Sequence, residues 1–221
     1  MSQISSDKGT YPSNIQRRIT ELLARENSLG TPDFTISGDI ALILSSTPVS
    51  LKNSEGIFTR ISHTVQASVE GDLMYVRQKE PSFYSRFKLP SSTSVRMFIG
   101  MTNQLPGQMT GNPTLPSGHY AGLYYNSALG TNWRFVHAGG GGATISVQNA
   151  VETINPHHFY LWMKKAGGQN NIIFQYDDND RYEASINIPG IVTPLRYVLA
   201  IGIISGTKQL DIAKMVINSE V

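Results

Sequence analysis

The sequence predicts an all-β protein folded as a two-layer β-sandwich, with a short arm and one helix in front of it. Two observations support this prediction. From residue 33 onward, apolar residues recur at every second position in short runs, which is the pattern of half-buried strands. Gly, Asn, Asp and Pro separate the runs, and these residues favour turns. A series of about a dozen short strands suits two stacked antiparallel sheets.

The N-terminal segment is expected to contain a single amphipathic helix. Ser13 is a candidate N-cap with Gln16 three residues later, and the Gly-Thr-Pro at 30–32 would stop the helix. Its apolar stripe consists of Ile15, Ile19, Leu22 and Leu29. The stripe packs on the sandwich or a neighbouring protein in one interpretation, and joins copies of the chain in the other. We therefore expect an attachment or oligomerisation segment at 1–32 and a sandwich domain at 33–221.

The alternation of apolar and polar residues defines the expected strands one by one. They cover residues 34–44 with a break at 38–39, 57–69, 73–77, 83–89, 95–101, 120–125, 133–138, 143–147, 159–164, 172–176, 182–188, 196–204 and 210–217. The longest interruption, at 103–118, has three successive turn signals and no element of its own. Long loops of this kind often carry function. The surface expected to make contacts comprises Asn103, Gln104, Gln108, Asn112, His119, Tyr125 and Asn126.

Composition excludes several classes of function. The net charge is only +2, and the 18 basic residues form no stripe of the kind that binds nucleic acid. There is no cysteine, so neither a disulfide framework nor a thiolate zinc site is expected. No apolar run reaches the roughly 20 residues that span a bilayer, so we expect no membrane insertion. The N-terminus lacks the features of a signal peptide, which predicts synthesis without secretory export.

Two polar clusters are candidate metal sites with simpler explanations. The acidic run 177–180 offers oxygen ligands for calcium, but it lies between two expected strands, where a hairpin turn favours Asn and Asp. His157 and His158 are adjacent, and neighbouring strand residues point to opposite faces, so both rings cannot easily hold one ion. We expect one buried and one exposed ring. His63, His119 and His137 are separate polar residues.

Catalytic signals are weak. The glycines at 139–142 lack the Lys-Ser/Thr of a phosphate loop and favour a hairpin tip. A retaining glycosidase needs two carboxylates about 5–5.5 Å apart. The nearest approach is Glu70 with Asp72, at a turn. We expect no metal, no cofactor and no enzymatic activity.

Sugar stacking is the open alternative to a purely structural role. The aromatic side chains that could stack on a sugar are Tyr120, Tyr124, Tyr125, Trp133, Tyr160 and Trp162. Alternating aromatics are also typical of a sandwich core. Trp133 and Trp162 are expected in the core, with the outward tyrosines left as possible contacts, beside the amides of Asn126 and Asn132.

Residues 57–218 resemble the concanavalin-like (lectin and glucanase type) jelly-roll modules of bacteriophage structural proteins. The motifs are Lys-Leu-Pro at 88–90, Arg-x-x-Ile-Gly at 96–100, Gly-x-Tyr at 122–124, Asn132-Trp133 and Asn-Ile-Pro at 187–189. This resemblance implies a non-enzymatic component of the virion, of the tail, neck or head fibre or capsid decoration type. Its partners would be other virion proteins, with a homotrimer expected. A receptor-recognition protein that binds host surface glycans and, third, a laminarinase-like glycoside hydrolase are the alternatives.

Overall fold

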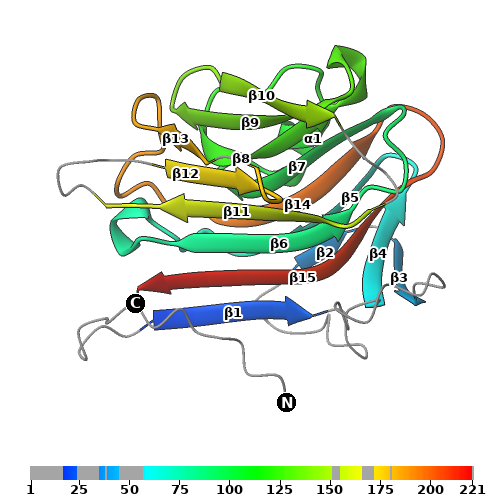
Figure 1. Cartoon of the computed structure of the whole chain (residues 1–221), viewed down its shortest axis with the longest axis horizontal. Coiled ribbons are helices and arrows are strands. Elements are labelled where there is room, and N and C mark those ends of the chain that lie inside the picture. Colours follow the sequence, from blue (N-terminus) through cyan, green and yellow to red (C-terminus); the bar gives the residue numbers. More distant parts are fainter. Residues whose placement is uncertain are drawn as a thin grey trace.

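The computed structural model describes residues 17–23, 35–37, 39–44, 57–150, 155–165, 172–179 and 181–220. In this part of the chain, two antiparallel sheets stack face to face (Figure 1). The eight-stranded sheet runs in the order β13 (Tyr182–Ala184), β12 (Ile172–Tyr176), β11 (His157–Met163), β6 (Ser82–Lys88), β15 (Lys208–Glu220), β4 (Ile57–His63) and β3 (Asp39–Leu44), with β1 (Arg17–Leu23) also paired to β15.

The seven-stranded sheet forms the other layer. Its order is β10 (Thr144–Ala150), β9 (Asn132–Gly139), β8 (His119–Asn126), β7 (Val95–Thr102), β14 (Arg196–Ile203), β5 (Gln66–Glu70) and β2 (Thr35–Ser37). The helical elements that the described residues contain are short: α1 (Pro106–Thr110) and the 3₁₀ turns Arg77–Lys79 and Ser127–Leu129. Among the described residues, no helix is long and apolar enough to cross a membrane. The prediction of a jelly-roll β-sandwich is confirmed.

The expected N-terminal helix is wrong where the structure describes it. Residues Arg17–Leu23 form strand β1, which runs antiparallel to β15 from Arg17 opposite Glu220 to Leu23 opposite Lys214 (Figure 1). An isolated helix of about 15 residues is marginal in water, whereas pairing with a long strand gives the backbone hydrogen-bond partners along seven positions. The proposed helical seam is therefore absent at Ile19 and Leu22. Ile15 and Leu29 lie outside the described residues, and the domain boundary at 32 stays a prediction.

Several strand predictions need smaller corrections. Residues 57–69 were expected as one strand, but the chain bends at 64–65 and β4 and β5 lie in different sheets. Residues 73–77 form no strand: Tyr75 makes an isolated bridge with Leu195, and Arg77 begins a 3₁₀ turn. The strand expected at 182–188 ends at Ala184. Residues 103–118 contain α1 instead of lacking secondary structure.

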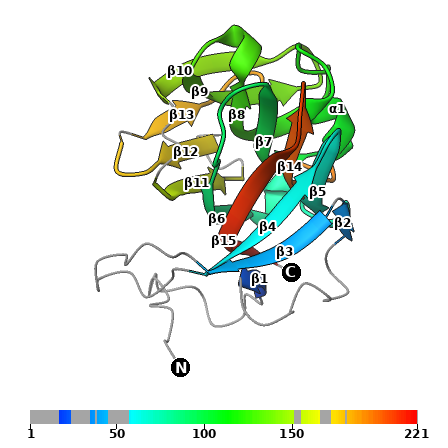
Figure 2. The same ribbon diagram turned by 90° about the vertical axis from the view of Figure 1, so that its right-hand side faces the viewer.

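Four strands of one sheet continue around a common corner into the other sheet. The adjacent strands β7, β14, β5 and β2 are joined in sequence to β6, β15, β4 and β3, which are adjacent in the same order. Figure 2 shows β4 running on into β5 at this corner. Backbone hydrogen bonds cross it, from Ile203 N–H to the Val65 carbonyl at 2.8 Å and from Ile204 N–H to the Ser94 carbonyl at 2.9 Å. These eight strands therefore form a four-stranded ribbon that bends once, so that one part of it lies in each sheet.

The core lies between the two sheets. Alternate residues of each strand point inward and meet side chains from the other layer, as the two-residue period predicts. The largest buried side chains of this cluster are Trp133, Phe83, Phe87, Phe135, Phe159, Phe174, Tyr125 and Tyr197. Complete burial of each large apolar side chain stabilises the fold by roughly 1.5–3 kcal/mol. A second apolar cluster, which includes Phe98, Met109 and Tyr120, lies on the outer face of the seven-stranded sheet.

Candidate functional site

The loop expected to make contacts packs down on the seven-stranded sheet. Met109 of α1 is buried against the outer apolar cluster of that sheet. The Tyr120 hydroxyl donates to the Pro116 carbonyl at 3.0 Å, and Arg96 Nη1 donates to the Gly111 carbonyl at 3.0 Å. A Cβ added at Gly202 would collide with the backbone carbonyl of Thr110. Much of this sheet face is therefore covered by the protein's own chain.

The loop residues chosen from the sequence divide by exposure. Tyr125 is 1% exposed and Asn126 is 0% exposed, so the prediction that they make surface contacts is wrong for both. The Tyr125 hydroxyl donates to the Ser92 carbonyl, and Asn126 Nδ2 donates to the Pro113 carbonyl. The phenol and the amide are groups that could bind a sugar, but here both donate hydrogen bonds to loop carbonyls.

The other five candidates are at least partly accessible. Asn103 Oδ1 accepts hydrogen bonds from Gln104 Nε2 at 2.9 Å and from the His119 backbone N–H at 3.0 Å, and all three residues are half-buried. Gln108 and Asn112 are exposed. Gln108 Oε1 accepts from the Leu105 backbone N–H and so caps α1. Asn112 is exposed like Gln108, but among the described residues no hydrogen bond connects its side-chain amide to the loop.

The two tryptophans have opposite environments. Trp133 of β9 is fully buried, as predicted, with Phe87 and Tyr125 packed around it. Trp162 of β11 is half-buried and points outward, so its expected place in the core is wrong. On β11 the burial alternates strictly, with Phe159, Leu161 and Met163 inward and the even-numbered residues outward. Sequence alternation gives the period of a strand but leaves open which set faces the core when both sets are aromatic.

Three rings form an aromatic strip on the outer face of the eight-stranded sheet. We use this name for Tyr84, Tyr160 and Trp162. Tyr84 of β6 lies opposite Tyr160 of β11 in the strand register, with ring centroids 4.8 Å apart. Tyr160 and Trp162 lie two residues apart and stack with centroids 5.5 Å apart and planes 5° from parallel. All three side chains are half-buried, so part of each ring is accessible.

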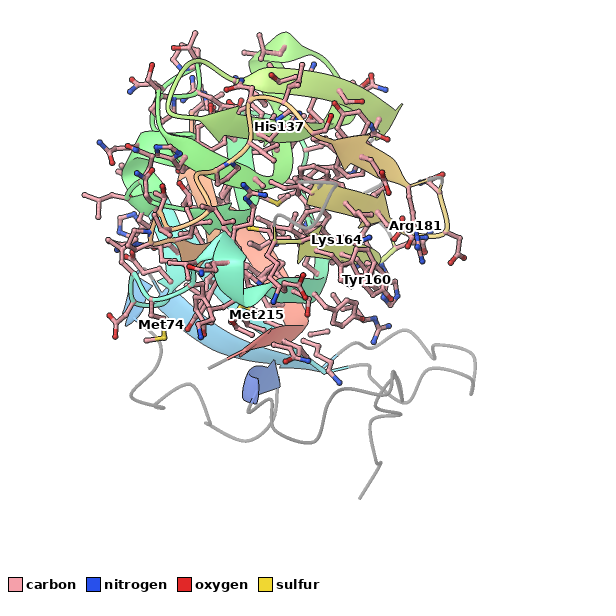
Figure 3. All side chains as sticks on the ribbon, turned by 90° about the vertical axis from the view of Figure 1, so that its left-hand side faces the viewer. Met74, His137, Tyr160, Lys164, Arg181 and Met215 are labelled. Carbon is pink, nitrogen blue, oxygen red and sulfur yellow. The ribbon has the colours of Figure 1, made fainter. Side chains whose placement is uncertain are left out.

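Polar groups border both ends of the aromatic strip. The Tyr84 hydroxyl and His158 Nδ1 are hydrogen-bonded at 2.8 Å, which fixes the Tyr84 ring. At the other end, the Arg181 guanidinium carbon lies 5.6 Å from the centre of the Trp162 ring. Figure 3 shows Tyr160 and Arg181 on the same side of the molecule, near β11 to β13. The pKa of the Tyr160 phenol is raised by burial and, secondarily, by the charges of Asp178 and Asp177.

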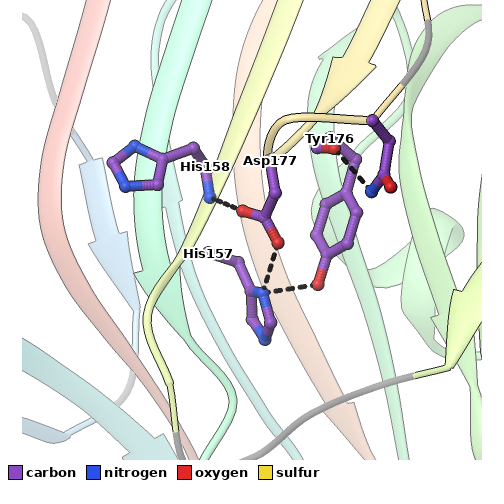
Figure 4. Close-up of polar contacts among 5 residues, drawn as sticks. His157, His158, Tyr176 and Asp177 are labelled. Carbon is purple, nitrogen blue, oxygen red and sulfur yellow. Dashed lines mark hydrogen bonds and ion pairs between the residues drawn. The ribbon is translucent and has the colours of Figure 1, made fainter.

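A hydrogen-bonded cluster holds the adjoining end of β11 (Figure 4). Asp177 Oδ2 lies 2.9 Å from His157 Nδ1, and Asp177 Oδ1 accepts from the His158 backbone N–H at 2.6 Å. The Tyr176 hydroxyl also contacts His157 Nδ1. His157 is buried and His158 half-buried, on opposite faces as predicted, and Asp177 has φ of 50° in the predicted turn. These groups connect β11 to the turn after β12, which aligns Tyr160.

The remaining histidines and the acidic pair at 70–72 have structural partners or lie in turns. Glu70 forms an ion pair with Arg196 at 2.7 Å, and Asp72 is exposed. His137 Nδ1 contacts the Asn187 carbonyl at 3.0 Å, and burial lowers the pKa of this imidazole. His63 Nδ1 accepts from the Val65 backbone N–H at the bend between β4 and β5. Gly139 ends β9, and residues 140–143 connect it to β10, so the glycines lie at a hairpin tip as predicted.

Known structures share this fold at very low sequence identity. No protein family model matches the sequence, and no curated protein matches it. Peanut lectin superposes with a TM-score of 0.59 at 11% identity, over 92% of this chain and 97% of the lectin. The carbohydrate esterase of the Shiga toxin-encoding bacteriophage phi24B gives 0.58 at 11%, over 92% and 100%. The Bacillus licheniformis β-glucanase gives 0.56 at 12%, over 94% of both chains. The fold is therefore that of concanavalin-like lectins and glucanases.

Proposed function

We propose that this protein binds carbohydrate through the aromatic strip without cleaving it. The observation that supports this proposal is the half-exposed series Tyr84, Tyr160 and Trp162 on an outer sheet face, where a polar side chain would be the ordinary choice. Aromatic faces and edges with a few convergent polar groups are typical of ligand sites. The Tyr84 hydroxyl and the Arg181 guanidinium supply such polar groups.

The absence of catalysis is part of the proposal. Glycoside hydrolysis requires a pair of carboxyl groups, one on each side of the scissile bond. Near the aromatic strip, Asp177 is held by His157 and by the His158 backbone, as a structural acceptor would be. Asp178 is exposed in the same turn. This arrangement supports binding more than acid-base chemistry.

A bacteriophage particle is the setting that we propose for this binding. The motifs across residues 57–218 resemble virion jelly-roll modules, and one structural neighbour is encoded by a bacteriophage. In this setting the protein would be a fibre or decoration component that contacts host surface glycans, built as a closed homotrimer with other virion proteins as partners. Particles should then contain the chain stoichiometrically, and its native mass should be three times 24.3 kDa. A monomeric mass would contradict the trimer but leave glycan binding open.

Binding by variants of the full chain tests the proposed surface. Trp162→Ala and Tyr160→Ala should each weaken binding to bacterial surface polysaccharide at least about tenfold, the size typical of an aromatic that anchors a ligand. Asn112→Ala is the matched control, because Asn112 lies on the loop over the other sheet. It should bind as the wild type does. If Asn112→Ala loses affinity and Trp162→Ala keeps it, the loop is the binding surface and the aromatic strip is not.

A further inference from the structure

The two ends of the aromatic strip differ in charge. Asp177 and Asp178 lie at the Tyr160 end, where their charges contribute to the raised pKa of the phenol. At the Trp162 end, Arg181 is exposed and its guanidinium lies over the indole. Lys164 is also exposed and follows Trp162 by two positions, directly after the last residue of β11. Figure 3 shows Arg181 near Tyr160, with Lys164 closer to the centre of the view.

The two cations at the Trp162 end are available to a ligand. Within the described ranges, neither the Arg181 nor the Lys164 side chain forms an ion pair with a carboxylate. Two acids lie near these cations: Glu80 Oε1 accepts from the Lys165 backbone N–H at 3.2 Å, and Glu183 of β13 lies opposite Ile173, which is the register partner of Trp162. Exposed cations beside an accessible ring offer a place for an anion, whereas the acidic end repels one.

We propose, on the basis of the carbohydrate-binding function above, that the protein selects acidic glycans. A sugar ring lies against the edge of the indole that Tyr160 and Arg181 leave open, and its carboxylate binds to Arg181 and Lys164. The planar guanidinium matches a carboxylate through two parallel hydrogen bonds, and Lys164 adds a point charge. The contact with the indole holds the guanidinium in place before the ligand arrives.

Matched polysaccharides separate this inference from the proposed function. The probes are polygalacturonate, alginate and polysialate, each beside its carboxyl-reduced form, in which every carboxylate has become a primary alcohol. The full-length protein should bind at least one acidic polymer about tenfold more tightly than its reduced form. That preference should shrink as sodium chloride is raised from 50 to 500 mM, because salt screens exposed charges.

Charge variants then test the named residues. Arg181→Gln should reduce the preference for the acidic polymer at least fivefold and leave binding to the reduced form unchanged. Lys164→Gln should have a smaller effect in the same direction, and Arg181→Lys an intermediate one. Lys165→Gln is the matched control with the same loss of charge, because Lys165 is exposed at the adjacent position. It should keep the full preference.

The outcomes are distinguishable. Equal affinity for the acidic and reduced forms, abolished in both cases by Trp162→Ala, would overturn the selection of acidic glycans and leave the carbohydrate-binding function intact. An unchanged preference in Arg181→Gln would also overturn the inference. If no polymer in either form binds to the wild-type protein, both the proposed function and the inference fail.

Discussion

Replacing each tryptophan by alanine should separate stability from binding. Trp133 is fully buried between the sheets, so Trp133→Ala leaves a cavity and should lower the free energy of unfolding by about 3–5 kcal/mol. Trp162 loses less on replacement. Its stack with Tyr160 is worth about 0.5–1.5 kcal/mol beyond area burial, and its contact with Arg181 about 0.5–1 kcal/mol. Trp162→Ala should therefore lose about 1–2.5 kcal/mol from these two contacts, plus the contribution of its partial burial, and it leaves no enclosed cavity.

Urea denaturation followed by circular dichroism measures both costs on the same scale. Trp133→Ala should be the more destabilising of the two, because only its replacement leaves an enclosed cavity between the sheets. Binding should show the opposite order, with affinity lost in Trp162→Ala and kept in the folded fraction of Trp133→Ala. Should Trp133→Ala not fold, Trp133→Phe retains most of the ring and permits the comparison. Equal destabilisation by the two alanine variants would refute the placement of Trp162 on an open face.

Three further predictions concern packing and titration. Gly202→Ala should destabilise the protein by about 1–3 kcal/mol in urea, because the added methyl group collides with the Thr110 carbonyl; an unchanged midpoint would contradict the packing of α1 on β14. Asp177→Asn should cost less than Asp177→Ala, since asparagine tolerates positive φ and retains an acceptor oxygen, whereas alanine loses both advantages; calorimetry should rank them in that order. Burial lowers the pKa of His137 below its ordinary 6.5, so the contribution of the neutral ring to stability is complete above pH 6.5 and is lost as the pH falls. His137→Gln should therefore reduce the fall in melting temperature on the acid side of a pH series. An unchanged fall would argue against a neutral buried ring.

The sequence predicted the sandwich because alternation and turn residues are local properties. Most strands from β6 to β15 begin and end within a few residues of the expected bounds. The errors arise where contacts with distant parts of the chain determine the secondary structure of a segment. Arg17–Leu23 has spacings that suit a helix, yet an available strand edge on β15 makes it a strand. At 64–65 the alternation continues through the bend, so nothing in its period marks the change of sheet.

The candidate site was predicted only in part. The aromatic residues predicted to stack on sugars include Tyr160 and Trp162 of the aromatic strip but not Tyr84. The other four of that set are buried: Tyr120, Tyr124, Tyr125 and Trp133. Which of them face solvent depends on the packing of whole sheets. The pairing of Tyr84 with Tyr160 joins residues 76 positions apart, and only the neighbouring register of β6 and β11 brings them together. A signal did exist in Tyr160 and Trp162, since β11 is aromatic at both parities and cannot bury every ring.

The ribbon that turns the corner has a consequence for how the chain tolerates insertions. Only residues 64–65 separate β4 from β5, and these two strands lie in different sheets. One residue inserted at 64–65 therefore changes the register of one sheet relative to the other. It would reverse the inward and outward sets in one layer relative to the other, unless the bend itself took up the extra length. Evolutionary change in length is therefore expected to concentrate away from this corner, at the hairpin tips such as 139–143 and 177–181. One of those tips carries Arg181. One of the places that can vary in length therefore borders the aromatic strip, so specificity can change there while the paired layers keep their alignment.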